Sequence, residues 1–199
     1  MATSGDLAKA LSELLKEPFS TVDLYGRHLR AAGMLSVKGH GRGAAEMTAR
    51  DAATWLISLV IDHPRGGDFA AETARVLRLP LFEATIYPEH FLWDLKVKDA
   101  KNAGQAIEFL MHDCLHERIR HPMEDLKRDN ILSIGIDPGG DSIAPGLHGP
   151  HSPEVFSAAL LVYRRGPEKP KPNLWRNHIL HGRVLLELAR VLDLKVPVT

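Results

Sequence analysis

The chain of 199 residues has only one cysteine, Cys114, so an internal disulfide framework is excluded. Folding then depends on packing, and we expect a reducing compartment, with the cytoplasm as the default location. Long apolar runs are also missing. The longest, such as residues 55–57 and 158–163, are far shorter than a membrane span or a signal-peptide core. We therefore expect neither secretion nor a membrane partner.

An excess of one charge is absent as well, because 25 Lys and Arg residues balance 25 Asp and Glu residues. This balance excludes a protein coated in positive charge, so any contact with nucleic acid has to come from one local face. Hydrophobic residues make up 44% of the chain, which is enough for one large core or two small ones. The pattern along the chain favours two domains.

The sequence lacks a Walker phosphate loop, a nucleophile elbow and a dinucleotide-binding glycine pattern. We therefore expect no enzyme activity, no catalytic residues and no cofactor. A histidine-rich region offers candidate zinc ligands at His112, Cys114, His116 and His121. On a helix, His112 and His116 share a face, but Cys114 lies about 200° from His112 and no glutamate follows that histidine. We expect no metal there, and an ion held by the histidine pair, or a small hydrolase using this region, is the alternative.

Positive charge is concentrated within residues 20–61. Between Arg27 and Arg50 the chain has five Lys or Arg residues and a single acid, Glu46. A local cluster of this kind is the electrostatic signature of a surface that binds phosphates. The alternative is a helical domain with a solvated basic face.

Apolar spacing predicts a first helix over residues 5–15, with Ser4 available as its cap and Pro18 ending it. A second helix is predicted over residues 21–32, with Ser20 or Thr21 as its cap. One side of this helix is apolar, and the opposite side has Asp23, Arg27 and Arg30. Gly33 is placed to close it in the left-handed conformation.

The segment after the second helix, residues 36–47, interleaves glycines with cations and predicts a flexible hairpin, or wing. Thr48 and Asp51 then have the spacing of a capping box, which predicts a third helix with its own apolar stripe. Three short helices and a wing can enclose one small core.

This order of elements is typical of a winged helix-turn-helix, in which the second helix enters the major groove. We assign the contacts with DNA to side chains of the second helix and the wing, namely Thr21, Arg27, His28, Arg30, Lys38, His40 and Arg42. Arg27 and Arg30 are the candidates for base contact, because arginine can donate two hydrogen bonds to guanine. Lys38, His40 and Arg42 are expected to hold phosphates or enter the minor groove.

The run TVDLYGRHLRAAGML, followed by the Gly/Arg loop and MTARDAATWLISLV, resembles the DNA-binding head of the MerR and phage excisionase group of winged helix proteins. It is also similar to the head of some phage small terminase subunits. The resemblance covers about 60 of the 199 residues. It implies a winged helix-turn-helix that binds DNA, although the first helix is longer than in the MerR type and the wing lacks aromatic residues.

The remaining chain predicts an α+β fold. Expected strands cover residues 82–87, 91–97, 130–136 and 155–164, and expected helices cover residues 70–79, 102–119 and 174–194. The Gly/Pro-rich residues 137–154 are expected to form a long loop. We therefore predict a mostly helical winged helix-turn-helix domain at residues 1–62, a connecting helix or linker at 63–80, and a small α+β domain, a sheet with two main helices, at 81–199.

The leading hypothesis is a sequence-specific protein that binds double-stranded DNA, a bacterial or phage transcriptional regulator forming a homodimer through residues 81–199. A protein-interaction adaptor and a phage DNA-packaging or recombination accessory subunit are the alternatives. Under the leading hypothesis, Arg30→Ala weakens specific binding by about 1 to 3 kcal/mol. Lys38→Ala is expected to weaken binding to all sequences similarly and to flatten the salt dependence.

Overall fold

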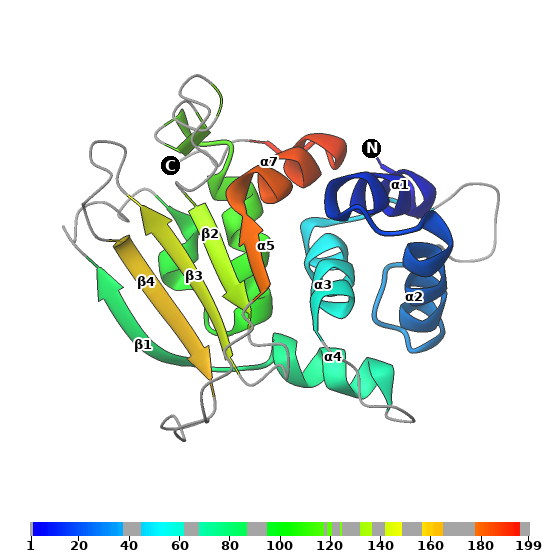
Figure 1. Ribbon diagram of the computed structural model, residues 1–199, viewed down its shortest axis with the longest axis horizontal. Helices are drawn as coiled ribbons and strands as arrows, with labels where there is room; N and C mark the ends of the chain where they lie inside the picture. Colours follow the sequence, from blue (N-terminus) through cyan, green and yellow to red (C-terminus); the bar gives the residue numbers. More distant parts are fainter. Residues whose placement is uncertain are drawn as a thin grey trace.

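The structure is a computed structural model that describes residues 2–37, 45–61, 68–86, 95–117, 119–120, 124, 132–136, 142–148, 157–164 and 178–195. These residues are mostly helical. Helices α1 to α4 form one side of the molecule and an antiparallel sheet forms the other (Figure 1). Helices α5 and α7 contact both the sheet and the α1–α4 side, so they form a middle layer.

Helix α1 (Ser4–Leu15) begins with a capping box between Thr3 and Asp6. The Thr3 hydroxyl accepts the Asp6 N–H at 3.3 Å, and the Asp6 carboxylate accepts the Thr3 N–H at 2.9 Å. The prediction that Ser4 caps this helix is therefore wrong. Thr3 takes the role because an acid stands three residues after it, so two N–H groups are satisfied reciprocally.

Helix α2 (Phe19–Ala31) begins two residues earlier than predicted, and neither Ser20 nor Thr21 caps it. The carbonyl of Pro18 already accepts the first helical bonds, from Thr21 and Val22. The predicted end is confirmed: Gly33 has φ 70°, its N–H donates to Arg30, and the next N–H donates to Leu29. These two bonds form a Schellman motif.

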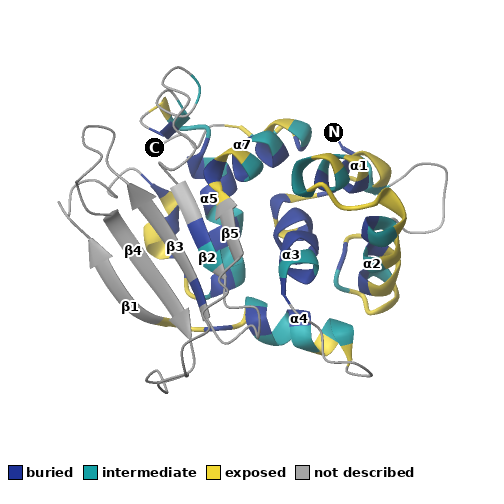
Figure 2. Cartoon of the chain, in the orientation of Figure 1, coloured by how far each residue is buried: buried dark blue, intermediate teal, exposed yellow. Residues whose placement is uncertain are grey.

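Helix α3 (Ala49–Val60) begins with the predicted capping box of Thr48 and Asp51. The helix is buried around most of its circumference, along Ala49 and residues 51–58, and not along one stripe as predicted. Helices α2, α4 and α5 pack around it, and Figure 2 shows it dark blue along most of its length. Within this helix, only Arg50 is exposed.

Helix α4 (Phe69–Leu77) is capped by Asp68, begins one residue before the predicted segment 70–79 and ends two residues before its limit. The predicted strand over residues 91–97 is wrong where the structure describes it, because Lys96–Asp99 form the 3₁₀ helix η2. The carboxylate of Asp113 accepts the N–H groups of Lys96 and Val97 at 2.8 and 2.9 Å. These bonds use the backbone donors that a strand would direct to a neighbouring strand.

Helix α5 (Ala103–Asp113) is capped by Asn102 and ends six residues before the predicted limit. The predicted helix over residues 174–194 is also shorter in the structure, since helix α7 covers only Gly182–Val191. The preceding residues, His178–His181, form strand β5. Pairing with another strand decides the conformation of these four residues.

The sheet has the order β1-β4-β3-β2-β5, with antiparallel neighbours. Its other strands are β1 (Leu81–Ile86), β2 (Leu132–Ile136), β3 (Ser142–His148) and β4 (Ser157–Arg164). Strand β3 lies inside the segment 137–154 that was expected to be a loop. It pairs with a strand on each side, and this pairing overrides its glycine and proline content.

One buried cluster extends through the described residues. It includes Leu7 of α1, Trp55 of α3, Ile107 of α5, Ile134 of β2 and Leu188 of α7. Helix α3 packs on α5 and α1 packs on α7. The core therefore does not divide near residues 62–81, where the sequence predicts a domain boundary.

Candidate nucleic-acid interface

Helices α1 and α2 are joined by a three-residue turn of Lys16, Glu17 and Pro18. Lys16 adopts the left-handed conformation with φ 60°, and the Glu17 N–H donates to the Ser12 carbonyl at 3.2 Å. The Ser12 hydroxyl donates back to the Glu17 carbonyl at 2.6 Å. A short, fixed turn therefore joins two helices that run in clearly different directions (Figure 1).

Arg27 is the most accessible of the predicted base-contacting residues, since 65% of its side chain is exposed. Its guanidinium contacts the Asp23 carboxylate one turn earlier, at 2.8 Å. An exposed pair of this kind contributes little to stability and can open at low cost. Arg27 is therefore available to a ligand at the outer surface of α2.

Arg30 has a different environment. Only 31% of its side chain is exposed, and its guanidinium donates to the Ser4 hydroxyl at 3.1 Å and lies 3.6 Å from Asp23. These contacts join α2 to the start of α1. Arg30 thus braces the two helices, a role that the sequence did not indicate.

Thr21 and His28 lie on another side of α2. They are seven positions apart, about two helical turns, so they share a face with Tyr25 between them. The Tyr25 ring packs edge-on against Phe69 of α4 at a centroid distance of 4.6 Å, and His28 lies 6.0 Å from the same ring. His28 is exposed and Thr21 half-buried. The structure therefore places these two residues toward α4, apart from Arg27 and Arg30.

The three predicted wing residues, Lys38, His40 and Arg42, lie outside the described residues. Both ends of their segment are fixed. The Ser36 N–H donates to the Asp51 carboxylate at 2.7 Å, and the Met47 N–H donates to the Ala2 carbonyl at 2.9 Å. The segment between α2 and α3 therefore has an anchored base beside both helices.

A polar groove of about 680 Å³ lies next to this base. Four parts of the chain line it: the turn after α2, the start of α3, the end of α4 and the start of α5. Its charged lining residues are Arg50, Asp51, Arg78 and Glu108. The sequence indicated no binding role for either Arg50 or Arg78. The groove joins segments that are distant in sequence, so no local pattern indicates it.

The histidine-rich region does not have the helical geometry that would make His112 and His116 a candidate ion-binding pair. Helix α5 ends at Asp113, so His116 does not continue the helical face of His112. His121 lies outside the described residues, which contain no group of three His, Cys, Asp or Glu side chains that could hold a metal ion. Burial lowers the pKa of His112, and its Nδ1 atom is buried without a hydrogen-bond partner.

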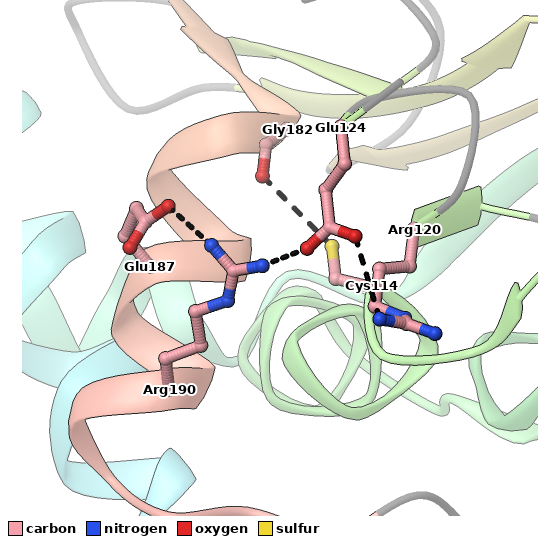
Figure 3. A network of polar contacts seen from close by, with 6 residues as sticks. All are labelled: Cys114, Arg120, Glu124, Gly182, Glu187 and Arg190. Atoms are coloured by element: carbon pink, nitrogen blue, oxygen red, sulfur yellow. Dashed lines mark hydrogen bonds and ion pairs between the residues drawn. The ribbon is translucent and has the colours of Figure 1, made fainter.

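Cys114 is also fully buried, and its Sγ lies 3.9 Å from the Gly182 carbonyl oxygen. Burial raises the pKa of its thiol above the usual value, which makes this cysteine a packing residue and a poor nucleophile. Figure 3 shows it beside a network of ion pairs that joins the segment before β2 to α7. Arg190 contacts Glu187 and Glu124, and Glu124 also contacts Arg120.

None of the described helices has the length and apolar character needed to cross a membrane. No protein-family model, no curated protein and no solved structure matches this chain. The geometry of the residues is therefore the basis for any statement about function.

Proposed function

We propose that this protein binds double-stranded DNA in a sequence-specific manner, through α2 and the segment of residues 36–47, as a bacterial or phage transcriptional regulator. The observation that carries the proposal is the unit formed by α1, its fixed turn and α2. This unit lies at the edge of the molecule (Figure 1). The Arg27 side chain on it is 65% exposed. A recognition helix has to be accessible along its length to enter a major groove.

In this arrangement Arg27 contacts a base edge. Asp23 forms an ion pair with Arg27 in the free protein. When DNA binds, this pair either opens or orients the guanidinium toward the base. Arg30 keeps α1 and α2 in their mutual position and contributes to binding through that position. Lys38, His40 and Arg42 then hold phosphates beside the groove that α2 occupies. The fold that we propose is a winged helix-turn-helix head joined to an α+β part.

We also propose that two copies associate through residues 81–199. The apolar side chains of α7 pack inside the described structure, against α1 and α5, so this helix is not the dimer contact. Strands β1 and β5 are the sheet edges, and an edge strand offers unpaired backbone groups to a second copy. A mass measurement in solution tests this: a dimer supports it, whereas a ring of more copies points to a DNA-packaging subunit.

Substitution of Arg27 tests the DNA proposal. After selection of a binding site from random DNA, Arg27→Ala is expected to weaken specific binding by about 1 to 3 kcal/mol and to relax specificity at one position. Lys195→Ala, an exposed cation after α7, is the matched control and should leave affinity unchanged. Arg30→Ala requires a parallel stability measurement, because its loss also removes the contact with Ser4. Absence of any salt-sensitive binding to genomic DNA would contradict the proposal.

A protein-interaction adaptor is the second candidate, and two exposed apolar side chains on α2 favour it. Phe19 is 51% exposed and Leu24 is 47% exposed. Apolar groups on the outside of a helix are a usual feature of a surface that docks a partner protein. An adaptor would lose its function with Phe19→Ser and Leu24→Ser and keep it when Arg27 is neutralised, the reverse of the result expected for a DNA-binding protein.

A further inference from the structure

We infer that the groove between the turn after α2 and helices α3, α4 and α5 is a phosphate-binding site that takes a phosphate ester. This goes beyond the proposed function, because neither Arg27 nor Arg30 lines the groove. The backbone of bound DNA and a free phosphorylated molecule of nucleotide size are the two sources of such a group. The size of the groove, about 680 Å³, lies within the range usual for small-molecule sites.

Two arginines give the groove its selectivity for an anion. Arg50, in the first turn of α3, and Arg78, at the end of α4, both line it and are both exposed. Within the described part of the chain, neither has a carboxylate at ion-pair distance. The neighbouring arginines differ, since Arg27, Arg30 and Arg75 each contact an acid. Arginines from two elements that share a groove without acidic partners are suited to bind phosphate, which accepts paired hydrogen bonds from guanidinium.

Among the described residues, no ion pair joins the two acids of the groove, Asp51 and Glu108, to these arginines. Asp51 is only 3% exposed, and its carboxylate accepts bonds from the Ser36 N–H, the Thr48 N–H and the Thr48 hydroxyl at 2.7, 2.8 and 2.7 Å. Its oxygens are therefore already engaged. Glu108 is half-buried and lies one turn after Gln105. Its carboxylate can accept a hydrogen bond from a hydroxyl group in the alcohol part of the ester.

The side-chain amides at the start of α5 supply neutral donors. The Asn102 oxygen accepts the Gln105 N–H, and the Gln105 oxygen accepts the Lys101 N–H, both at 2.9 Å. These bonds use the oxygens and leave the NH₂ groups for a ligand. Because Asn102 and Thr48 already cap α5 and α3, the helix ends are largely satisfied. Most of the ligand's charge is therefore held by Arg50 and Arg78.

Backbone NMR during titration with pyrophosphate tests the inference on the full chain. We expect amide shifts confined to the groove, at residues 48–54, 78 and 102–108. In Arg50→Gln and in Arg78→Gln the apparent affinity should fall about tenfold, as for loss of a charge-assisted hydrogen bond. Arg50→Lys keeps the charge and loses the planar guanidinium, so its affinity for pyrophosphate should lie between those of the wild type and Arg50→Gln. Lys9→Gln, an exposed cation of α1 outside the groove, should leave the affinity unchanged. Absence of groove shifts, or equal affinity in all variants, would overturn the inference.

Two further titrations identify the source of the phosphate. Groove shifts with a DNA duplex that are lost in Arg50→Gln assign the site to the DNA backbone. Shifts with a nucleoside monophosphate, and none with the duplex, assign it to a free ligand. The two proposals fail separately. If DNA shifts the α2 amides but pyrophosphate causes no shifts in the groove, only the inference of a phosphate site is wrong. If pyrophosphate binds but DNA does not, only the proposed DNA-binding function is wrong.

Discussion

Gly26 lies where the indole ring of Trp55 crosses α2. A Cβ atom added at Gly26 would overlap the Trp55 ring, which is fully buried and donates its Nε1–H to the Val22 carbonyl at 3.1 Å. Gly26→Ala is therefore expected to destabilise the protein by about 1 to 3 kcal/mol, the usual cost of overpacking. This cost exceeds the gain of roughly 1 kcal/mol from the better helix propensity of alanine. The midpoint of denaturant unfolding measures the change.

Gly5 provides the matched control, because it is also a helical glycine. A Cβ added there meets only the Thr3 hydroxyl, at an ordinary contact distance of 3.7 Å. Gly5→Ala should leave stability unchanged or raise it by up to about 1 kcal/mol. Equal effects of the two substitutions would show that contact with Trp55 does not determine the residue at position 26.

Asp113 makes stability depend on pH. It is fully buried at the end of α5, and burial raises the pKa of its carboxyl from 3.8 to about 6. The pKa is higher in the folded than in the unfolded chain, so the folded protein binds this proton more tightly. The contribution to stability is complete below the unfolded pKa and is lost as the pH rises through about 6.

The variant Asp113→Asn isolates this contribution. Between about pH 5 and pH 8, the stability of the wild type relative to the variant is expected to fall by roughly 1 kcal/mol. The variant loses one of the two bonds to Lys96 and Val97, but that loss is the same at every pH. Titration of His112 occurs in both proteins and cancels in the difference. Thermal or denaturant unfolding at several pH values measures the difference in unfolding free energy between the wild type and the variant. A difference that does not change with pH would contradict a raised pKa of Asp113.

Single residues were predictable from the sequence where their role is local. Gly33 and the pair Thr48 and Asp51 act within one helix turn, and the structure confirms them. Gly26 was not predictable, because its partner Trp55 comes from another helix. A glycine inside a helix appears unfavourable until that partner is known. The bracing role of Arg30 was hidden for the same reason.

At the scale of elements, Asp51 joins α3 to the start of the segment of residues 36–47. Its carboxylate caps α3 and also accepts the Ser36 N–H. Asp51→Ala is expected to cost about 1 to 2 kcal/mol, because the N–H groups of Ser36 and Thr48 lose a buried acceptor. Asp6→Ala removes the equivalent exposed acid from the capping box of α1 and should have a smaller effect, since water can replace it. Unfolding midpoints of both variants test this order.

The same substitution is expected to affect the proposed DNA contact. With Asp51→Ala the N–H groups of Ser36 and Thr48 lose their acceptor, so the amides of these two residues should exchange faster in a hydrogen-exchange measurement. Asp6→Ala should leave these amides unchanged. Equal exchange in the two variants would indicate that Asp51 does not fix the base of the segment.

Helices were more predictable than the elements that depend on distant partners. The apolar spacing of α1, α2 and α5 is contained within each helix, and the structure differs mainly at their ends. Strands β3 and β5 exist because β2 lies between them and pairs with both. The 3₁₀ helix η2 depends on the Asp113 carboxylate, which comes from a residue far along the chain. Such partners leave no periodic signal in the segment itself.

At the scale of the whole molecule, the candidate sites differ in how they could be found. The surface of α2 depends on one helix and its turn, so the sequence indicated Arg27. The groove depends on four segments, from residue 32 to residue 108, that meet only in the folded chain. Arg50 and Arg78 therefore gain a common role only through the packing of α3, α4 and α5.

The continuous core leads to a prediction about the domain boundary. Helix α3 buries side chains against α5, and α1 packs against α7, so a fragment of residues 1–80 would expose both contact faces. A helical unit that loses this much apolar contact is not expected to retain a fixed tertiary structure. We expect the fragment to show partial helicity in far-UV circular dichroism and poor amide dispersion in NMR, whereas the full chain unfolds in a single transition by both probes. Cooperative unfolding of the fragment would show instead that the amino-terminal helices form an independent domain, as the sequence pattern predicts.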